Sequence, residues 1–129
     1  MSIAEEFRRL TDQLPSVKPA SDVDGFDEAY VLADLNDLLA GASRDQIERL
    51  SAPSIDNPYL ENYVAAMVEH AIHLKGGIRP PLWTAQVAPL SRPVFAVPWM
   101  SLRAHLLLES PVAFRRRNIF IDSSVGDRV

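Results

Sequence analysis

The stretch from Asn57 to Pro81 constrains the fold most, because it defines where one long helix begins and ends. Asn57 is a strong N-cap residue, and Pro58 fits the first turn of a helix. Apolar residues then recur at spacings of four, three, four and three: Leu60, Val64, Met67, Ala71 and Leu74. Gly76-Gly77 and Pro80-Pro81 prevent the helix from continuing. The pattern predicts a helix from Asn57 to Leu74 with one apolar stripe.

Two further helices are predicted near the N-terminus. Residues 3–10 have an amphipathic pattern, and Ser2 can cap it. A polar linker at residues 15–25 separates this helix from the apolar pattern of residues 26–40, which Gly41 terminates.

A short third helix is predicted to start after Ser43. Ser43 and Gln46 have the spacing of a capping box, in which each residue satisfies the backbone N–H of the other. Ile47 and Leu50 follow as apolar residues, and Pro53 closes the segment.

The C-terminal half contains a connector rich in proline. Residues 77–97 hold Pro80, Pro81, Pro89 and Pro93, so neither a long helix nor a central strand is expected there. A helix is predicted from Pro98 to about Glu109, a helical turn after Ser110-Pro111, and a short strand at residues 119–121. The fold class is therefore mainly α: a small single-domain bundle of five or six helices with at most a minor C-terminal β element.

Charge divides the chain into two halves. Residues 1–74 hold fourteen acidic against five basic side chains, a balance of −9, whereas residues 75–129 hold eight basic against three acidic, a balance of +5. Such a charge distribution favours docking onto a partner with a complementary field. We expect an acidic N-terminal helical region at residues 1–52 and a helical module with a basic C-terminal segment at residues 53–129.

Several functional classes are disfavoured by what the sequence lacks. The absence of cysteine excludes disulfides and thiolate-based sites. The first fifteen residues lack the apolar segment of a signal peptide, and no apolar run approaches the roughly 18 residues of a membrane helix. No nucleophile-elbow or phosphate-loop motif occurs. We expect a cytoplasmic protein that is not an enzyme, uses no cofactor and has no membrane partner.

The histidines are weak candidates for a metal site. His70 and His73 lie about one turn apart on the predicted helix, and His105 lies on the helix after Pro98. No H-E-x-x-H motif is present, and two ligands without a third carry little information. Packing beside the apolar stripe is the favoured interpretation, and no metal ligand is predicted.

The strongest single signal is the triplet Arg115-Arg116-Arg117. Guanidinium groups bind carboxylates and phosphates bidentately, so the triplet is a candidate docking patch. On a helix, however, successive residues point about 100° apart, so the three cannot all face one ligand, and one of them can pair with an acidic helix instead. The two interpretations stay open. Trp83 and Trp99 are interface anchors or, with more weight, core residues.

Residues 26–50 give a helix, a glycine and a second helix, which superficially matches a helix-turn-helix. This segment carries six acidic side chains against Arg44 and Arg49 alone. A recognition helix has to approach phosphates, so a local charge of −4 argues against DNA reading by this half.

From about Asp56 onward, the sequence is distinctive in several segments: the 57–74 helix with Glu69-His70, Pro81-Leu82-Trp83, Arg92-Pro93-Val94-Phe95, Leu102-Arg103-Ala104 and the run from Glu109 to Ile121. In these segments it resembles a module of bacterial antitoxins and regulators. That module often follows a helix-turn-helix domain and tends to be encoded beside a nucleotidyltransferase-like protein. The pattern S-P-x-x-F-R-x-R with a following apolar triplet is its most distinctive part and is not a catalytic signature. The chain departs from the family in its N-terminal part, where no DNA-binding domain is recognisable.

The resemblance implies an antitoxin-like protein that binds and neutralises a nucleotidyltransferase-like toxin of a bacterial toxin–antitoxin system. The expected partner-binding residues are Arg115, Arg116, Arg117, Phe114, Trp83 and Trp99. Two alternatives remain: a nucleic-acid-binding transcriptional accessory that uses the basic half, and a small metal-dependent enzyme built on the three histidines. Assembly into a homo-oligomer is left open.

Overall fold

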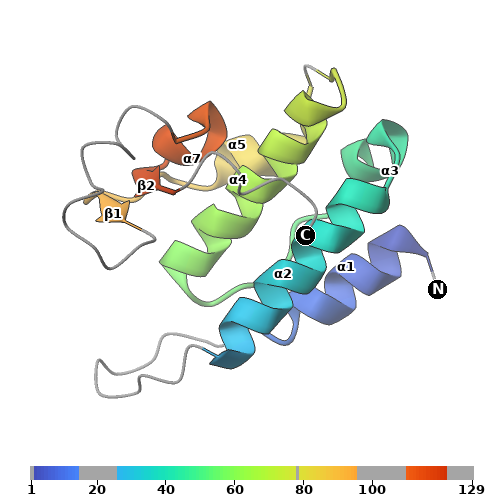
Figure 1. Ribbon diagram of the computed structural model, residues 1–129, viewed down its shortest axis with the longest axis horizontal. Coiled ribbons are helices and arrows are strands. Elements are labelled where there is room, and N and C mark those ends of the chain that lie inside the picture. The colour runs from blue at the N-terminus through green and yellow to red at the C-terminus, as the bar shows by residue number, and fades with distance from the viewer. Residues whose placement is uncertain (1, 15–25, 78, 96–109, 122–129) are drawn as a thin grey trace.

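The computed structural model describes four segments of the chain: residues 2–14, 26–77, 79–95 and 110–121. Helix α4, Pro58–Leu74, lies at the centre of the fold and confirms the predicted helix (Figure 1). The Asn57 side chain caps it, because its Oδ1 accepts hydrogen bonds from the backbone N–H groups of Tyr59 and Leu60 at 3.1 and 3.2 Å.

Three helices precede α4: α1 (Ile3–Thr11), α2 (Phe26–Gly41) and α3 (Arg44–Glu48). The caps are those that the sequence predicts. Ser2 Oγ accepts from the N–H of Glu5, and Ser43 and Gln46 form a complete capping box. Helix α1 packs on α2, and α2 and α3 both pack on α4 (Figure 1).

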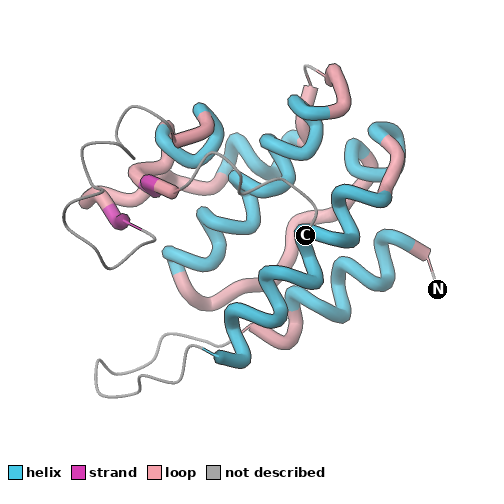
Figure 2. Tube along the Cα trace, viewed as in Figure 1, coloured by secondary structure: helices cyan, strands magenta, loops and turns pink. Residues whose placement is uncertain are grey.

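On the other side of α4 lie α5 (Leu82–Gln86), β1 (Val94–Phe95), α7 (Val112–Arg115) and β2 (Ile119–Phe120). The two strands pair in parallel, with Val94 opposite Ile119 and Phe95 opposite Phe120. Figure 2 shows that these strands are short and that helices dominate the described chain. The prediction of a mainly helical domain with a minor β element is therefore confirmed.

The prolines of the connector set the limits of its elements. Helix α5 begins directly after Pro80-Pro81, and β1 begins directly after Pro93. Both positions suit a residue that cannot donate a backbone hydrogen bond. Neither α5 nor β1 was predicted individually, since both are too short to produce a periodic pattern.

One hydrophobic core joins the two regions that the sequence distinguishes at residues 1–52 and 53–129. It includes side chains from every described helix except α5, among them Phe7 of α1, Leu35 of α2, Ile47 of α3 and Phe114 of α7. Helix α4 is buried on more than one face, because it packs on α2 and α3 on one side and on α7 on the other. The predicted single stripe is therefore too narrow. Leu74, placed in that stripe, is 56% exposed.

Some predictions lie outside the described residues. They concern the linker at residues 15–25 and the helix at residues 98–109, together with Trp99 and His105.

Candidate functional site

The third arginine of the triplet points into the protein. Arg117 is 4% exposed, and its Nε lies 3.0 Å from Oε1 of Glu69 on α4. Its Nη1 donates to Oδ1 of Asn62 at 3.0 Å and to the carbonyl of Val87 at 3.2 Å, and its Nη2 donates to the carbonyl of Thr84 at 2.5 Å. The planar guanidinium thus binds α4 and the connector at the same time, which a point-like ammonium cannot do with the same geometry.

The groups around Arg117 are themselves fully engaged. The amide nitrogen of Asn62 donates to the carbonyls of Pro58 and Ala88 at 2.9 and 3.0 Å. The hydroxyl of Thr84 donates to the carbonyl of Pro81 at 2.9 Å. Among the described residues, no buried side-chain nitrogen or oxygen lacks a hydrogen-bond partner. A buried polar network of this kind is stabilising only when it is complete, as it is here.

The residues around Arg117 in the sequence fold back on the same connector. Asn118 has a positive φ of 63°, a conformation that asparagine tolerates better than most residues. Its Nδ2 donates to the carbonyl of Leu90 at 2.6 Å, and its own carbonyl accepts from the N–H of Val94 at 2.7 Å. Ser110 connects the two ends of the segment 110–121. Its Oγ donates to the carbonyl of Ile121 at 3.0 Å and accepts from the N–H of the same residue at 2.9 Å.

Those segments of the family resemblance that the structure describes therefore lie close together; Leu102-Arg103-Ala104 falls outside the described residues. The run from 110 to 121 contacts each of the others: Arg117 binds Glu69 of the 57–74 helix and Thr84 of the connector, and residues 118–120 pair with β1. In the distinctive pattern S-P-x-x-F-R-x-R, Ser110, Phe114 and Arg117 are all buried. These positions of the pattern therefore have a structural role in this half of the molecule.

Two of the predicted partner-binding residues have to be corrected on this basis. Phe114 is 0% exposed and packs edge-to-face on Tyr63, with ring centroids 5.2 Å apart. Arg117 is consumed by the internal network. Neither side chain is accessible to a partner in this fold, because the core and the ion pair with Glu69 occupy them.

Trp83 is half-buried and connects two helices that lie apart in the sequence. Its indole N–H donates to the carbonyl of Leu50 at 3.0 Å, and its ring centroid lies 6.4 Å from that of Phe7. These contacts give Trp83 a structural role at the α1–α3 side of the connector, which leaves only part of its surface for any other contact.

Arg115 and Arg116 remain on the surface. Both are exposed, and Val112, one turn earlier on α7, is 55% exposed. Within the described part of the chain, neither of these guanidinium groups is in an ion pair. Phe114 and Arg117 fix α7 from beneath, so the exposed residues stand on a well-anchored turn.

The histidines occupy different environments. His70 is half-buried with its ring centroid 6.1 Å from that of Phe114, whereas His73 is exposed. The described residues contain no group of three or more His, Cys, Asp or Glu side chains arranged to hold a metal ion. The metal-site alternative consequently gains no support from α4, and His105 lies outside the described residues.

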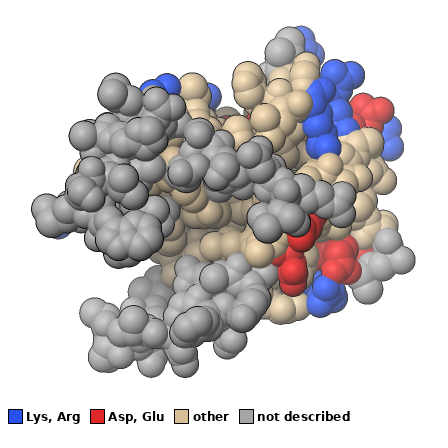
Figure 3. All heavy atoms as spheres, in the orientation of Figure 1, with Lys and Arg blue, Asp and Glu red and all other residues tan. Residues whose placement is uncertain are grey.

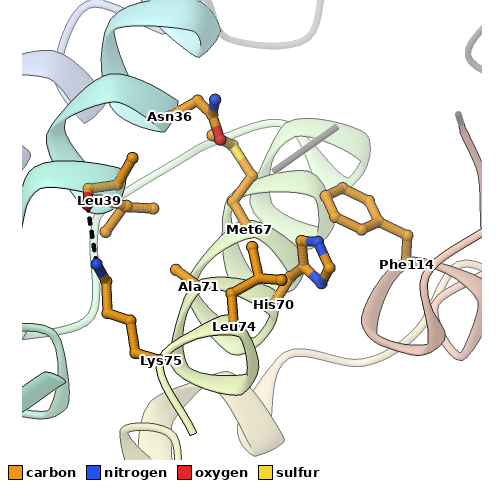
Figure 4. Close-up of a pocket in the computed structure, with 9 residues that line it drawn as sticks. Asn36, Leu39, Met67, His70, Ala71, Leu74, Lys75 and Phe114 are labelled. Atoms are coloured by element: carbon orange, nitrogen blue, oxygen red, sulfur yellow. Dashed lines mark hydrogen bonds between the residues drawn. The ribbon is translucent and has the colours of Figure 1, made fainter. Parts of the chain in front are cut away.

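Two hollows meet at His70. A pocket of about 170 Å³ lies between α2, α4 and Phe114, and both apolar side chains such as Met67 and polar ones such as Asn36 line it (Figure 4). At its edge, Nζ of Lys75 donates to the carbonyl of Ala40 at 2.9 Å and so caps the end of α2 (Figure 4). A larger open groove of about 640 Å³ lies on the other side of His70, between α4 and α7.

The folded chain does not keep its charges in two separate halves. On the face shown in Figure 3, basic side chains gather near the ends of α3 and α4, with acidic ones beside them and over α2. Arg44, from the acidic region, lies against Gly77 at the start of the basic half, since a Cβ built on Gly77 would be 2.9 Å from Arg44 Cδ. Sequence reasoning had no means of detecting this mixing, because it depends on tertiary contacts.

None of the described helices is long and apolar enough to cross a membrane. Comparisons of the chain with protein-family models, with curated proteins and with solved structures gave no match.

Proposed function

We propose that the chain is a non-enzymatic, cytoplasmic interaction protein of the antitoxin type, and that it binds and neutralises a nucleotidyltransferase-like partner. The observation that carries this proposal is the exposed pair Arg115 and Arg116 on a turn whose opposite side is locked into the core. The identity of the partner comes from the resemblance of residues 56–129 to the antitoxin module.

The anchoring of α7 supports a binding role. A long cationic side chain on a mobile loop loses conformational freedom when it binds, and this loss weakens association. The backbone of α7 is held by Phe114 in the core and by the four contacts of Arg117. Arg115 and Arg116 are therefore presented from a fixed base, which reduces the entropic cost of docking.

The chemistry of the proposed partner matches this surface. Nucleotidyl transfer generally uses acidic side chains to hold metal ions against phosphate groups. Guanidinium groups bind carboxylates bidentately and are always charged. Arg115 and Arg116 can thus take the place of the cations in an acidic cleft and block the entry of a nucleotide. Arg117 contributes indirectly, by supporting the turn.

The test is charge reversal on α7. The chain is co-purified with the product of the adjacent gene, and the dissociation constant and the neutralisation of toxicity are measured for the double variant Arg115→Glu/Arg116→Glu. We expect binding to weaken by about tenfold or more, with a steep dependence on salt, because reversed charges repel an acidic cleft.

The matched control is Arg8→Glu/Arg49→Glu, which changes the net charge by the same amount at two exposed positions on α1 and after α3. This control should bind like the unmodified protein. Undiminished binding and neutralisation by the α7 variant, with its circular dichroism spectrum unchanged, would refute the cleft-blocking mechanism.

A further inference from the structure

The groove of about 640 Å³ between α4 and α7 has the features of a docking site. Glu69, His70 and His73 of α4 form one wall, and Val112 and Arg116 belong to the α7 wall. Its volume lies within the range of about 300–1,000 Å³ that is usual for ligand pockets. Neither the antitoxin resemblance nor the charge pattern of the sequence indicated this groove.

The walls of the groove are tied together. Glu69 belongs to one wall, and Arg117, which follows Arg116 of the other wall, pairs with it at 3.0 Å. Because this ion pair is 5% and 10% exposed, it lies beneath the surface and holds α4 and α7 at a set separation. A groove that exists before binding avoids the cost of ordering its walls.

The charged and apolar side chains that line the groove indicate which kind of segment it can bind. Among the described residues that line it, Glu69 is the only carboxylate, and Arg117 neutralises it. The charge that remains at the lip is that of Arg116, with the exposed imidazole of His73 on the opposite wall. Val112, 55% exposed, adds apolar surface whose burial against an apolar side chain is favourable. Positive charge beside an exposed apolar side chain fits an acidic segment that also carries an apolar residue.

We infer that this groove receives an acidic segment of the partner protein, with one apolar side chain of that segment packed on Val112. This inference rests on the proposed function, and it adds the place of contact and the chemistry of the contacting segment. It extends the interface from the two arginines to both α4 and α7.

The absence of cysteine allows a direct test, because a single introduced thiol is unique in the chain. Val112→Cys places that thiol at the groove, and Leu82→Cys places it at an exposed apolar position, 84% accessible, that does not line the groove. Alkylation rates are measured for both variants with and without saturating product of the adjacent gene. We expect the partner to slow alkylation at position 112 by about tenfold or more and at position 82 by less than about twofold, since an interface core excludes solvent.

A second measurement identifies the occupant. The thiol at position 112 is coupled to a benzophenone group and photocrosslinked in the complex, and the attached partner peptide is sequenced by mass spectrometry. We expect a peptide with a surplus of Asp and Glu next to an apolar residue. A basic peptide, or full reactivity at position 112 in a complex that forms normally, would overturn the groove assignment and leave the proposed function standing. Failure of the unmodified chain to bind the adjacent gene product would instead remove the proposed function and the groove assignment with it.

Discussion

Arg117 and Glu69 form an ion pair in the interior of the protein, with Nε 3.0 Å from Oε1, although 48 residues separate them in the sequence. Buried ion pairs stabilise a fold only when further hydrogen bonds offset the loss of hydration. Here Asn62, Thr84 and Val87 supply those bonds. The pair is therefore the junction that holds α4, the connector and α7 together.

Replacing Arg117 by methionine should destabilise the fold by about 3–5 kcal/mol, because it leaves the Glu69 carboxylate and several acceptors buried without a donor. Urea unfolding followed by circular dichroism measures this. The matched control Arg115→Met, at an exposed neighbouring position, should change the free energy of unfolding by less than about 0.5 kcal/mol. Adding Glu69→Leu to Arg117→Met should recover part of the loss. Equal unfolding free energies for Arg117→Met and Arg115→Met would contradict the assigned role of Arg117.

Asn118 should be sensitive to both its side chain and its backbone conformation. Asn118→Gly removes the hydrogen bond from the side-chain amide to the carbonyl of Leu90 and should cost about 1 kcal/mol. Asn118→Ala removes the same hydrogen bond but keeps a Cβ at a positive φ of 63°, without the polar side chain that lets asparagine tolerate this conformation, so it should cost roughly 1–2 kcal/mol more than the Gly variant. Thermal unfolding of the two variants separates the contributions. A Gly variant no more stable than the Ala variant would show that backbone strain at this position is negligible.

Two glycines should respond in opposite directions to alanine. A Cβ at Gly77 would lie 2.7 Å from Cγ2 of Ile72, whose side chain is buried, so Gly77→Ala should destabilise the protein by about 1–3 kcal/mol. Nothing lies within 4 Å of a Cβ at Gly41, the last residue of α2, so Gly41→Ala should stabilise it by about 0.5–1 kcal/mol. Unfolding free energies of both variants in one denaturant series provide the check. A loss of stability from Gly41→Ala would be inconsistent with the open space around it.

Tyr63 should make stability depend on pH in the alkaline range. Burial raises its pKa from 10.0 to about 12. Because the folded pKa is the higher one, the contribution is fully present below about pH 10 and is lost as the pH rises toward about 12. The shift corresponds to roughly 2–3 kcal/mol. Unfolding free energies measured across this range should fall less steeply for Tyr63→Phe. Identical slopes for the two proteins would argue against a buried phenol.

The sequence predicts the helices of this fold well where local rules apply. Asn57 and Ser43 cap α4 and α3 through bonds within three residues, so their spacing is visible in the sequence. The short strand β2 follows from the apolar triplet at residues 119–121. Local rules fail for β1, which exists only because the distant residues 118–120 pair with it.

The candidate site was predicted only in part, for the same reason. The sequence does not show which arginine of the triplet 115–117 is buried. Arg117 is the buried one because the fold places Glu69 and Asn62 within hydrogen-bond distance of it. Phe114 carries no local sign that it belongs to the core rather than to an interface. The groove beside Val112 requires the packing of α7 on α4, which no periodicity of the sequence expresses.

The burial of one arginine beside two exposed ones has a consequence for genetic experiments. Positions 115 and 116 are exposed, so a lysine there should leave the fold intact and affect only recognition. At position 117 the guanidinium group donates to four acceptors, on α4 and on the connector. Lysine and every neutral residue should therefore destabilise the fold at this position. A screen that replaces all three codons together would register misfolding and report it as lost recognition, and the three positions have to be varied one at a time.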